Sequence, residues 1–474
     1  MITAERPTKS SRATPASRVV ALLTAVAVGA ASVPAQAQES TKGLPLVRDA
    51  EIEQLLRDYT QPILRAAGLS QQNIRVVIIN DRSFNAFVAD ARRIFINSGA
   101  LMEAQTPNQI IGVFAHETGH IAGGHLSKMR EQIANATTQS IIAMLIGVGA
   151  MVAGARSGGG SGGLAQAGAA AMTGPQSMIQ RSLLAYVRTQ EEQADRAGVK
   201  FLSATGQSAK GMYETFKRFA DQMLFTAAYI DPYVQSHPMP TERVAALGEL
   251  AKTSPYWDKK DSAELQLRHD LMRAKLSGFM ERPDTVARRY PASDTSLAAR
   301  YARAISSYRH SDLREANTQI DALIQAQPNN PYFHELKGQA LLESGHAAAA
   351  IAPLRRAVQL APNPALIQVL LGQALVAAND PKLAEEAVST LRTAMTREPE
   401  VPEGYTQLAM AYGRKGDLAQ ADLASAQAAA ARGDLKTARE LAARAKTRFA
   451  VGTPGWVKAD DIVGSKPSAG STSP

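Results

Sequence analysis

The chain has 474 residues, of which 45% are hydrophobic and 20% charged, with a formal net charge of +9 and no cysteine. This is the composition of a globular protein, and at about 150 residues per domain the length accommodates two or three folded units. The lack of cysteine excludes thiol catalysis, disulfides and cysteine-ligated metals, so a catalytic metal would need histidine and carboxylate ligands. Charges of both signs are interspersed, so no nucleic-acid partner is expected.

The N-terminus has the pattern of an export signal. Arg18 precedes an apolar run over 19–33, and the small-x-small sequence A-Q-A ends at Ala37. Fifteen apolar residues are fewer than the roughly 20 that a membrane span requires. We therefore expect residues 1–37 to be a signal peptide that is cleaved between Ala37 and Gln38, and the mature protein to lie in the periplasm. An uncleaved N-terminal anchor is the alternative.

The run TPNQIIGVFAHETGH carries a pattern typical of metal binding on a helix. Thr106 and Pro107 predict the helix start, with a capping oxygen followed by a residue whose φ is already helical. His116 and His120 then lie about 40° apart on one helix face, so that both imidazoles can reach one ion. Glu117 follows the first of them and is placed to act as a general base. The alternative is that both histidines lie on an exposed polar face.

A third ligand is needed, because a catalytic zinc ion has three protein ligands and an open fourth position. His125 is one residue short of the spacing in the extended H-E-x-x-H-x-x-G-x-x-H motif. A second helix is predicted over 178–202, where Glu191 and Asp195 share a face. The first could bind the metal, and the second could accept the free N–H of a histidine ligand. Glu192 is the neighbouring alternative, and a solvated acidic helix face is the alternative without a metal.

Residues 141–155 form a strongly apolar run, and a glycine-rich stretch over 156–163 follows it. Fifteen residues are short for a membrane span. The run is expected to be either a core helix or an interfacial segment, which would make peripheral contact with a membrane or cover the active site.

The C-terminal half is rich in alanine and leucine and repeats with a period of 34 residues. The sequence GQAL begins at Gly338 and again at Gly372, which is the period of tetratricopeptide helix pairs. Small residues recur where the two helices of such a pair cross closely. We expect a helical connector over 256–296, an all-α tetratricopeptide solenoid with a partner-binding groove over 297–450, and a disordered tail over 464–474. A generic alanine-rich helical bundle is the alternative.

Four sequence blocks resemble one family of zinc metallopeptidases. HETGH is followed by E-x-x-A-D-R-x-G from Glu191, and the segments NAF at 85–87, RRIFINSGAL from Arg92 and SHPMPTER from Ser236 also match. The family includes the CAAX-prenyl protease, HtpX and the mitochondrial Oma-type proteases. With an export signal before it and tetratricopeptide repeats after it, the arrangement resembles the periplasmic β-barrel assembly-enhancing members. The resemblance implies a zincin-type metallopeptidase domain over 48–255, of the α+β class but mostly α, with a small sheet.

The resemblance also implies roles for individual residues. One Zn²⁺ ion per chain would be held by His116, His120 and Glu191. Glu117 would act as the catalytic base, with Asp195 supporting a ligand. Substrate would add as a β-strand beside the segment Arg93, Ile94, Phe95, Ile96 and Asn97.

His237 is implied to reach the zinc ion, where it would serve as a regulatory fourth ligand that occupies the position of the catalytic water. A latched enzyme of this kind would cleave only after the loop moves away. The alternative is that His237 stabilises the oxyanion of the reaction intermediate.

These features predict a periplasmic zinc endopeptidase with a chaperone-like role in outer-membrane protein quality control. Its partners would be unfolded or misassembled outer-membrane proteins and, through the repeat groove, the β-barrel assembly machinery. One alternative is a non-proteolytic tetratricopeptide chaperone or assembly adaptor, whose zinc site is structural and closed by His237. Another is an unspecific secreted protease.

Overall fold

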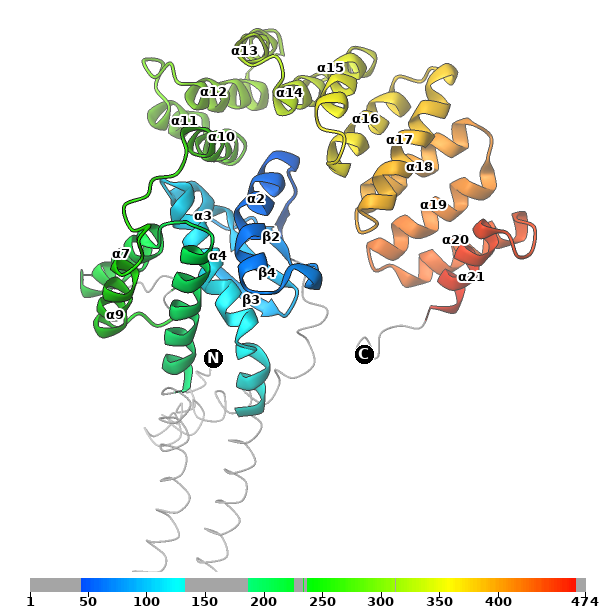
Figure 1. Cartoon of the computed structure of the whole chain (residues 1–474). Coiled ribbons are helices and arrows are strands. Elements are labelled where there is room, and N and C mark those ends of the chain that lie inside the picture. The colour runs from blue at the N-terminus through cyan, green and yellow to red at the C-terminus, as the bar shows by residue number, and fades with distance from the viewer. Residues whose placement is uncertain (1–43, 133–185, 226–232, 234–236, 312, 466–474) are drawn as a thin grey trace, which may run out of the picture. The chain divides into compact units, whose positions relative to one another are not determined.

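The computed structural model describes residues 44–132, 186–225, 233, 237–311 and 313–465 (Figure 1). The predicted signal peptide, the apolar run and the glycine-rich stretch after it lie outside these residues, as does most of the predicted tail. Contacts divide the chain into two units, one of residues 45–125 and 181–474 and the other of residues 1–44 and 126–180. The described part of the second unit is Leu44 and residues 126–132. Residues 126–132 belong to a helix that begins at residue 125.

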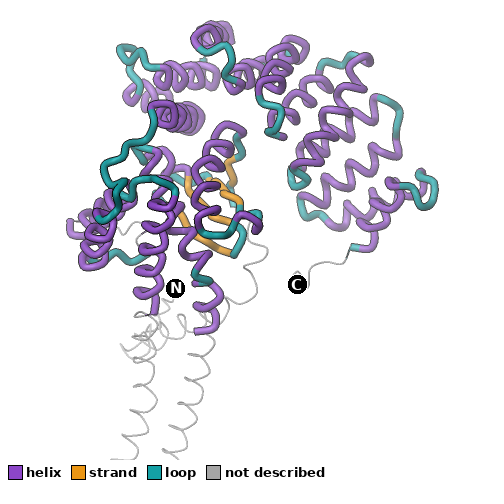
Figure 2. The backbone as a smooth tube through the Cα atoms, in the orientation of Figure 1, coloured by secondary structure: helices purple, strands orange, loops and turns teal. Residues whose placement is uncertain are grey.

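Four short strands form one sheet in the order β1-β2-β4-β3 (Figure 2). Strand β4 pairs in parallel with β2 and antiparallel with β3, and β1 pairs antiparallel with β2. Phe87 of β3 lies opposite Phe95 of β4, and the two rings stack with centroids 5.2 Å apart. The strands are Leu46–Val47 (β1), Arg75–Ile79 (β2), Ala86–Asp90 (β3) and Arg93–Asn97 (β4).

The strand order corrects the prediction of a substrate strand beside Arg93–Asn97. Strand β4 lies inside the sheet, and its backbone pairs with β2 on one side and β3 on the other. Because no edge of β4 is free, a substrate cannot add beside it, and this prediction is wrong. Alternating hydrophobicity predicts which face of a strand is buried but not which strands flank it. The edge strand next to β4 is β3.

Six helices accompany the sheet within the described residues 45–125 and 186–252; α2, α3 and α4 contact its strands, and α7 packs on α4 and α9. Helix α2 begins after Asp49, whose carboxylate accepts the N–H of Ile52 at 2.9 Å as an N-cap should. Its apolar face, including Leu56 and Ile63, is buried in a core shared with the sheet and α4. The helices are α2 (Ala50–Ala66), α3 (Ser98–Glu103), α4 (Pro107–Ala122), the helix of residues 186–204, α7 (Lys210–Phe225) and α9 (Thr241–Lys252).

Helix α4 begins at Pro107 as predicted, but its cap differs from the prediction. Thr106 occupies the N-cap position and its side chain makes no capping hydrogen bond. Instead, the carboxylate of Asp261 accepts the N–H of Asn108 at 2.9 Å, and a carboxylate there also suits the positive end of the helix dipole. The helix ends before a turn in which Gly124 has a φ of +62°, a conformation that glycine adopts without strain.

The described residues from 263 to 464 form helices joined by short turns, in agreement with the prediction of an all-α repeat region. Helices begin at Leu297, Pro331 and Ala365, at intervals of 34 residues, and at Pro402 after an interval of 37. The helices are α10 (Ala263–Met280), α11 (Pro283–Arg289), α12 (Leu297–His310), α13 (Leu313–Ala326), α14 (Pro331–Glu343), α15 (Ala347–Leu360), α16 (Ala365–Ala377), α17 (Ala384–Arg397), α18 (Pro402–Arg414), α19 (Leu418–Ala431), α20 (Leu435–Arg448) and α21 (Pro454–Gly464).

The glycines of the two GQAL sequences lie where paired helices cross. A Cβ atom on Gly338 would collide with the side chain of Leu354, and one on Gly372 would collide with Leu391. Both leucines are fully buried. The recurring small residue is therefore required by the close approach of α14 to α15 and of α16 to α17.

The N-terminal end of α2 packs against three helices of the repeat region. Ala50 is buried with Ala357 and Ile367, and the Tyr301 hydroxyl donates to the Glu51 carboxylate at 3.0 Å. These contacts join the sheet-containing part of the chain to α12, α15 and α16. We refer to this contact region as the junction.

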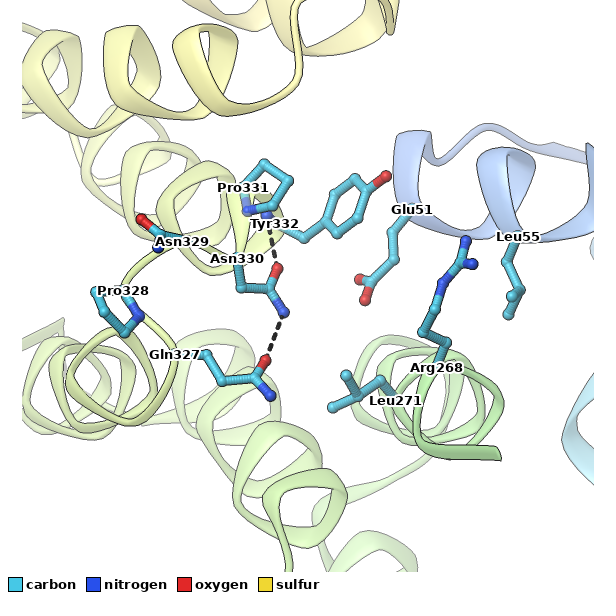
Figure 3. A pocket seen from close by; sticks show the side chains of 10 residues that line it. All are labelled: Glu51, Leu55, Arg268, Leu271, Gln327, Pro328, Asn329, Asn330, Pro331 and Tyr332. Carbon is cyan, nitrogen blue, oxygen red and sulfur yellow. Dashed lines mark hydrogen bonds between the residues drawn. The ribbon is translucent and has the colours of Figure 1, made fainter. Parts of the chain in front are cut away.

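A cavity of about 440 Å³ lies at the junction, between α2, α10 and the turn from α13 to α14 (Figure 3). Glu51 extends from α2 into the cavity and Arg268 extends from α10 towards α2, and the amides of Gln327 and Asn330 lie on the opposite wall. Leu55, Leu271, Pro328, Pro331 and Tyr332 supply the rest of the lining together with Asn329, so the cavity combines polar and apolar walls. Among the residues described, no helix has the length and apolar character needed to cross a membrane.

Candidate metal centre

Two histidines of α4 point into one buried cluster. The Nε2 atoms of His116 and His120 lie 3.0 Å apart, and the imidazole of His116 is fully buried. Their spacing of one helical turn places both rings on the same face of α4. Together with Glu191 and His237 they form a group in which one donor atom from each residue lies within 4.8 Å of the others.

The helix of residues 186–204 supplies the carboxylate of this group. Glu191 Oε2 lies 3.3 Å from His116 Nε2, and Glu191 Oε1 lies 3.5 Å from His120 Nε2. Glu192 is exposed and lies outside the cluster. The two helices can approach because small residues meet between them: a Cβ atom on Gly119 would lie only 2.9 Å from the Cα atom of Ala194. The helix–helix crossing therefore selects Glu191 over its neighbour.

His125 lies behind the cluster rather than in it. Its Nδ1 atom is 3.0 Å from Nδ1 of His120, the ring nitrogen opposite the one that faces His116. The turn after α4 brings His125 to this position, because the helix ends at Ala122 before the side chain could point away. His125 can thus fix the ring orientation of His120, the usual role of a partner behind a ligand.

Glu117 is the buried carboxylate next to the donor group. It is fully buried, and within the described part of the chain neither carboxylate oxygen has a hydrogen-bond partner. The imidazole of His237 lies beside it, with Nε2 3.4 Å from Glu117 Oε1. Burial raises the pKa of Glu117. A carboxyl group with a raised pKa and free oxygens is suited to take up and release a proton.

Asp195 holds the ring of His116 from the side away from the cluster. Its Oδ1 atom lies 3.0 Å from His116 Nδ1. Burial lowers the pKa of His116, but hydrogen bonds to Asp195 and Glu191 outweigh burial and raise it to about 9. Burial would raise the pKa of Asp195, but Arg243 outweighs this and lowers it. The surroundings of His116 therefore favour a positive charge at the cluster, whether a proton or a metal ion.

His237 reaches the cluster from the chain before α9. Its Nδ1 atom lies 3.3 Å from His116 Nε2 and 3.1 Å from Glu191 Oε2. The ring of Tyr233 lies beside it, with centroids 4.7 Å apart, and both side chains are buried. The structure thus places the nitrogen of His237 among the candidate ligands, where the prediction assigned it.

Sequence reasoning did not single out Arg243 as a site residue. Its guanidinium donates to both oxygens of Asp195, at 2.7 and 2.8 Å, and lies 3.0 Å from Glu191 Oε2. The only available signal was its place in the SHPMPTER block, six residues after His237. That spacing does not reveal a contact with a helix some 50 residues earlier in the chain.

The residues present fit a metal ion. Three imidazole nitrogens and one carboxylate converge, and histidine with carboxylate is a donor set typical of zinc and related transition metals. Two buried carboxylates, Glu191 and Asp195, contact both Arg243 and the imidazole of His116.

A small sheet with a histidine–carboxylate cluster on two crossing helices, followed by tetratricopeptide helix pairs, defines a metallopeptidase-type domain with a repeat domain. Residues 48–251 match peptidase family M48, and residues 301–365 match the tetratricopeptide repeat. The chain therefore contains an M48 peptidase domain and tetratricopeptide repeats.

Curated relatives match most of the chain. The chain is 24% identical over 413 residues to the β-barrel assembly-enhancing protease of Yersinia pestis, and 24% identical over 429 residues to that of Escherichia coli (strain K12). Each match covers 86% of this chain and 82% of the relative. The solved structure of MamA overlaps 34% of this chain and 90% of its own, with 17% identity and a TM-score of 0.28.

Proposed function

We propose that this protein is a periplasmic zinc endopeptidase that acts in the quality control and assembly of outer-membrane β-barrel proteins. One observation carries the enzymatic part of the proposal: His116, His120 and Glu191 converge beside the buried and unpartnered carboxylate of Glu117. The names of the curated relatives, which are assembly-enhancing proteases, support the outer-membrane role.

In this proposal His116, His120 and Glu191 hold one Zn²⁺ ion per chain. When bound, zinc supplies a Lewis acid that polarises the peptide carbonyl and lowers the pKa of water. Glu117 accepts the proton of the attacking water and delivers it to the amine nitrogen that leaves. Burial favours the protonated form of Glu117, which makes it an effective donor in the second step. Asp195 keeps the His116 ring in place through Nδ1.

The substrate backbone is proposed to add to the free edge of β3, in place of the predicted pairing with β4. Strand β3 (Ala86–Asp90) pairs with β4 on one side only and packs against α4, the helix that carries His116 and His120. Backbone pairing at a sheet edge gives affinity with little sequence preference. This suits an enzyme whose substrates share a misfolded state rather than a sequence.

His237 is proposed to be a regulatory fourth ligand. A neutral imidazole that completes His116, His120 and Glu191 would close the coordination shell and give a resting enzyme. Cleavage would then require the His237 segment to move, with the equilibrium shifted by partner binding. The protein could assist assembly while closed and degrade substrates once open.

The domain limits keep their predicted values in this proposal: a signal peptide over 1–37, the peptidase domain over 48–255, a connector over 256–296 and repeats over 297–450. The repeat groove would receive the unfolded outer-membrane protein or the assembly machinery. Peripheral contact with the membrane would place the enzyme near its substrates.

The proposal is tested by zinc content and casein cleavage of the wild type and the Glu117→Gln variant. Glutamine keeps the shape of the side chain but cannot accept a proton, so the variant should bind zinc normally and lose at least about 100-fold in turnover. Equal cleavage by both proteins would remove Glu117 from the mechanism.

The presence of His237 among the donors favours one second candidate, a non-proteolytic assembly adaptor with a closed, structural zinc site. In that case the wild type would contain zinc but cleave neither casein nor an unfolded outer-membrane protein. The Glu117→Gln variant would then support outer-membrane assembly as well as the wild type does.

A further inference from the structure

Among the residues described, Arg243 is the one arginine or lysine that contacts the metal cluster. Its guanidinium reaches Asp195, Glu191 and the backbone at Pro238. Arg243 is 6% exposed and lies in the first turn of α9. Its Nε and Nη2 atoms donate to the two oxygens of Asp195, its Nη1 lies 3.0 Å from Glu191 Oε2, and Nη1 also donates to the carbonyl oxygen of Pro238 at 2.8 Å. Pro238 follows His237 directly.

The direction of this guanidinium is fixed by packing. Its Cζ atom lies 5.5 Å from the centre of the Phe216 ring, and the same ring lies edge-on to His116 at 5.2 Å. Phe216 comes from α7 and is buried. The plane of the guanidinium is therefore held by an aromatic face on one side while its donors are spread over three acceptors, a geometry that a lysine ammonium cannot reproduce.

Charge gives Arg243 a second task. Arg243 is the guanidinium partner of two buried carboxylates, Glu191 and Asp195. Without it, both carboxylates would lose this positively charged partner. Leaving a buried charge without its partner is strongly unfavourable.

We propose that Arg243 is the positioning residue of the metal centre. One guanidinium sets the Glu191 carboxylate and Asp195 in place and ties the backbone after His237 to both of them. Metal binding and the position of the His237 segment are thereby linked through a single side chain. This inference rests on the proposed metal centre and adds to it a residue that never contacts the substrate.

The test compares Arg243→Lys with the wild type by competition for Zn²⁺ against a chromophoric chelator. Lysine keeps the charge, but its single nitrogen atom lacks the planar, spread donors of the guanidinium and cannot reproduce all three contacts, so zinc affinity should fall about 10- to 100-fold, the usual effect of losing a partner behind a ligand. Amide hydrogen exchange at His237 and Met239 should also become faster, because the bond to the Pro238 carbonyl is lost. Arg268→Lys is the matched control, because Arg268 forms an ion pair with Asp58 and neither residue belongs to the metal cluster.

A purely structural role gives a different result. It would lower the melting temperature of the zinc-free and zinc-loaded forms equally and leave zinc affinity and exchange at 237–239 unchanged, which would overturn the inference. Arg243→Gln, which removes the charge, should lower affinity more than Arg243→Lys, and Arg243→Lys remains measurable if the glutamine variant does not fold. If the wild type itself binds no zinc, the proposed metal centre is wrong. If the wild type and Arg243→Lys bind zinc with equal affinity, the metal centre stands and only the role of Arg243 is wrong.

Discussion

The metal cluster and the junction are two buried charge clusters of nearly the same composition. Each contains three carboxylates and one cation: Arg243 serves the metal cluster, and Lys275 serves the junction. Lys275 Nζ lies 2.7 Å from Asp49, 3.2 Å from Glu51 and 3.9 Å from Glu335. Both clusters therefore carry two negative charges in excess if every carboxyl group is ionised.

The two clusters relieve this excess in different ways. In the junction, burial outweighs the effect of Lys275 and raises the pKa of Glu335 to about 8, so that this carboxyl group is protonated at neutral pH. In the metal cluster the carboxylates stand among three imidazole nitrogens that face one another. Convergent nitrogen donors, rather than an excess of acid, thus distinguish a site for a metal ion from a structural charge cluster.

Removing a cation should expose this difference most strongly in the junction. Lys275→Met removes the ammonium group shared by Asp49, Glu51 and Glu335, and removing one partner of a buried ion pair costs about 3–5 kcal/mol of folding free energy. Urea unfolding should show this loss. Zinc affinity of the folded variant should remain that of the wild type, and a parallel loss of zinc would mean that the two clusters are coupled.

Removing a carboxylate should separate the clusters by metal content. Glu191→Ala deletes a proposed ligand and should lower zinc occupancy together with turnover, whereas Glu192→Ala alters an exposed neighbour and serves as the control. Asp195→Ala should weaken zinc binding about 10- to 100-fold. Metal analysis that finds Glu192→Ala depleted and Glu191→Ala normal would contradict the proposed ligand set.

His237 offers a smaller effect within the metal cluster. If it is a fourth ligand that closes the site, His237→Ala should raise the initial rate of cleavage of an unfolded substrate several-fold at equal zinc content. If it stabilises the oxyanion, the same variant should be slower, because a donor is lost from the transition state. Initial rates on one substrate therefore distinguish the two roles, and a slower variant rules out the latch.

The parts of this molecule that sequence patterns predicted are those whose determinants are local. The starts of α12, α14 and α16 follow from small residues repeated every 34 residues, and the shared faces of His116 with His120 and of Glu191 with Asp195 follow from helical geometry. Both sets depend only on residues within one helix or one helix pair.

The parts that sequence patterns missed depend on long-range contacts. The flanking of β4 on both sides, the cap of α4 by Asp261, and the contacts of Arg243 and Lys275 join residues far apart in the chain. Hydrophobic periodicity and spacing carry no information about such partners. The ionic partners inside both buried clusters could therefore be found only from the fold.

The two clusters should also differ in how the stability of the protein depends on pH. Because the pKa of Glu335 is raised from 4.5 to about 8 in the folded protein, the folded state binds more protons than the unfolded state between these values. Its contribution to stability is complete below about pH 4.5, declines as the pH rises through this range, and is lost above pH 8. Glu335→Gln keeps the shape of the protonated group without titrating, so at pH 9 the variant should be more stable than the wild type by about 1.4 kcal/mol for each unit by which folding raises the pKa of Glu335, and at pH 5 by less than about 1 kcal/mol. Urea unfolding at the two pH values measures this, with Glu343→Gln, on the same helix, as the control. An equal difference at both pH values would show that Glu335 does not take up the excess charge of the junction.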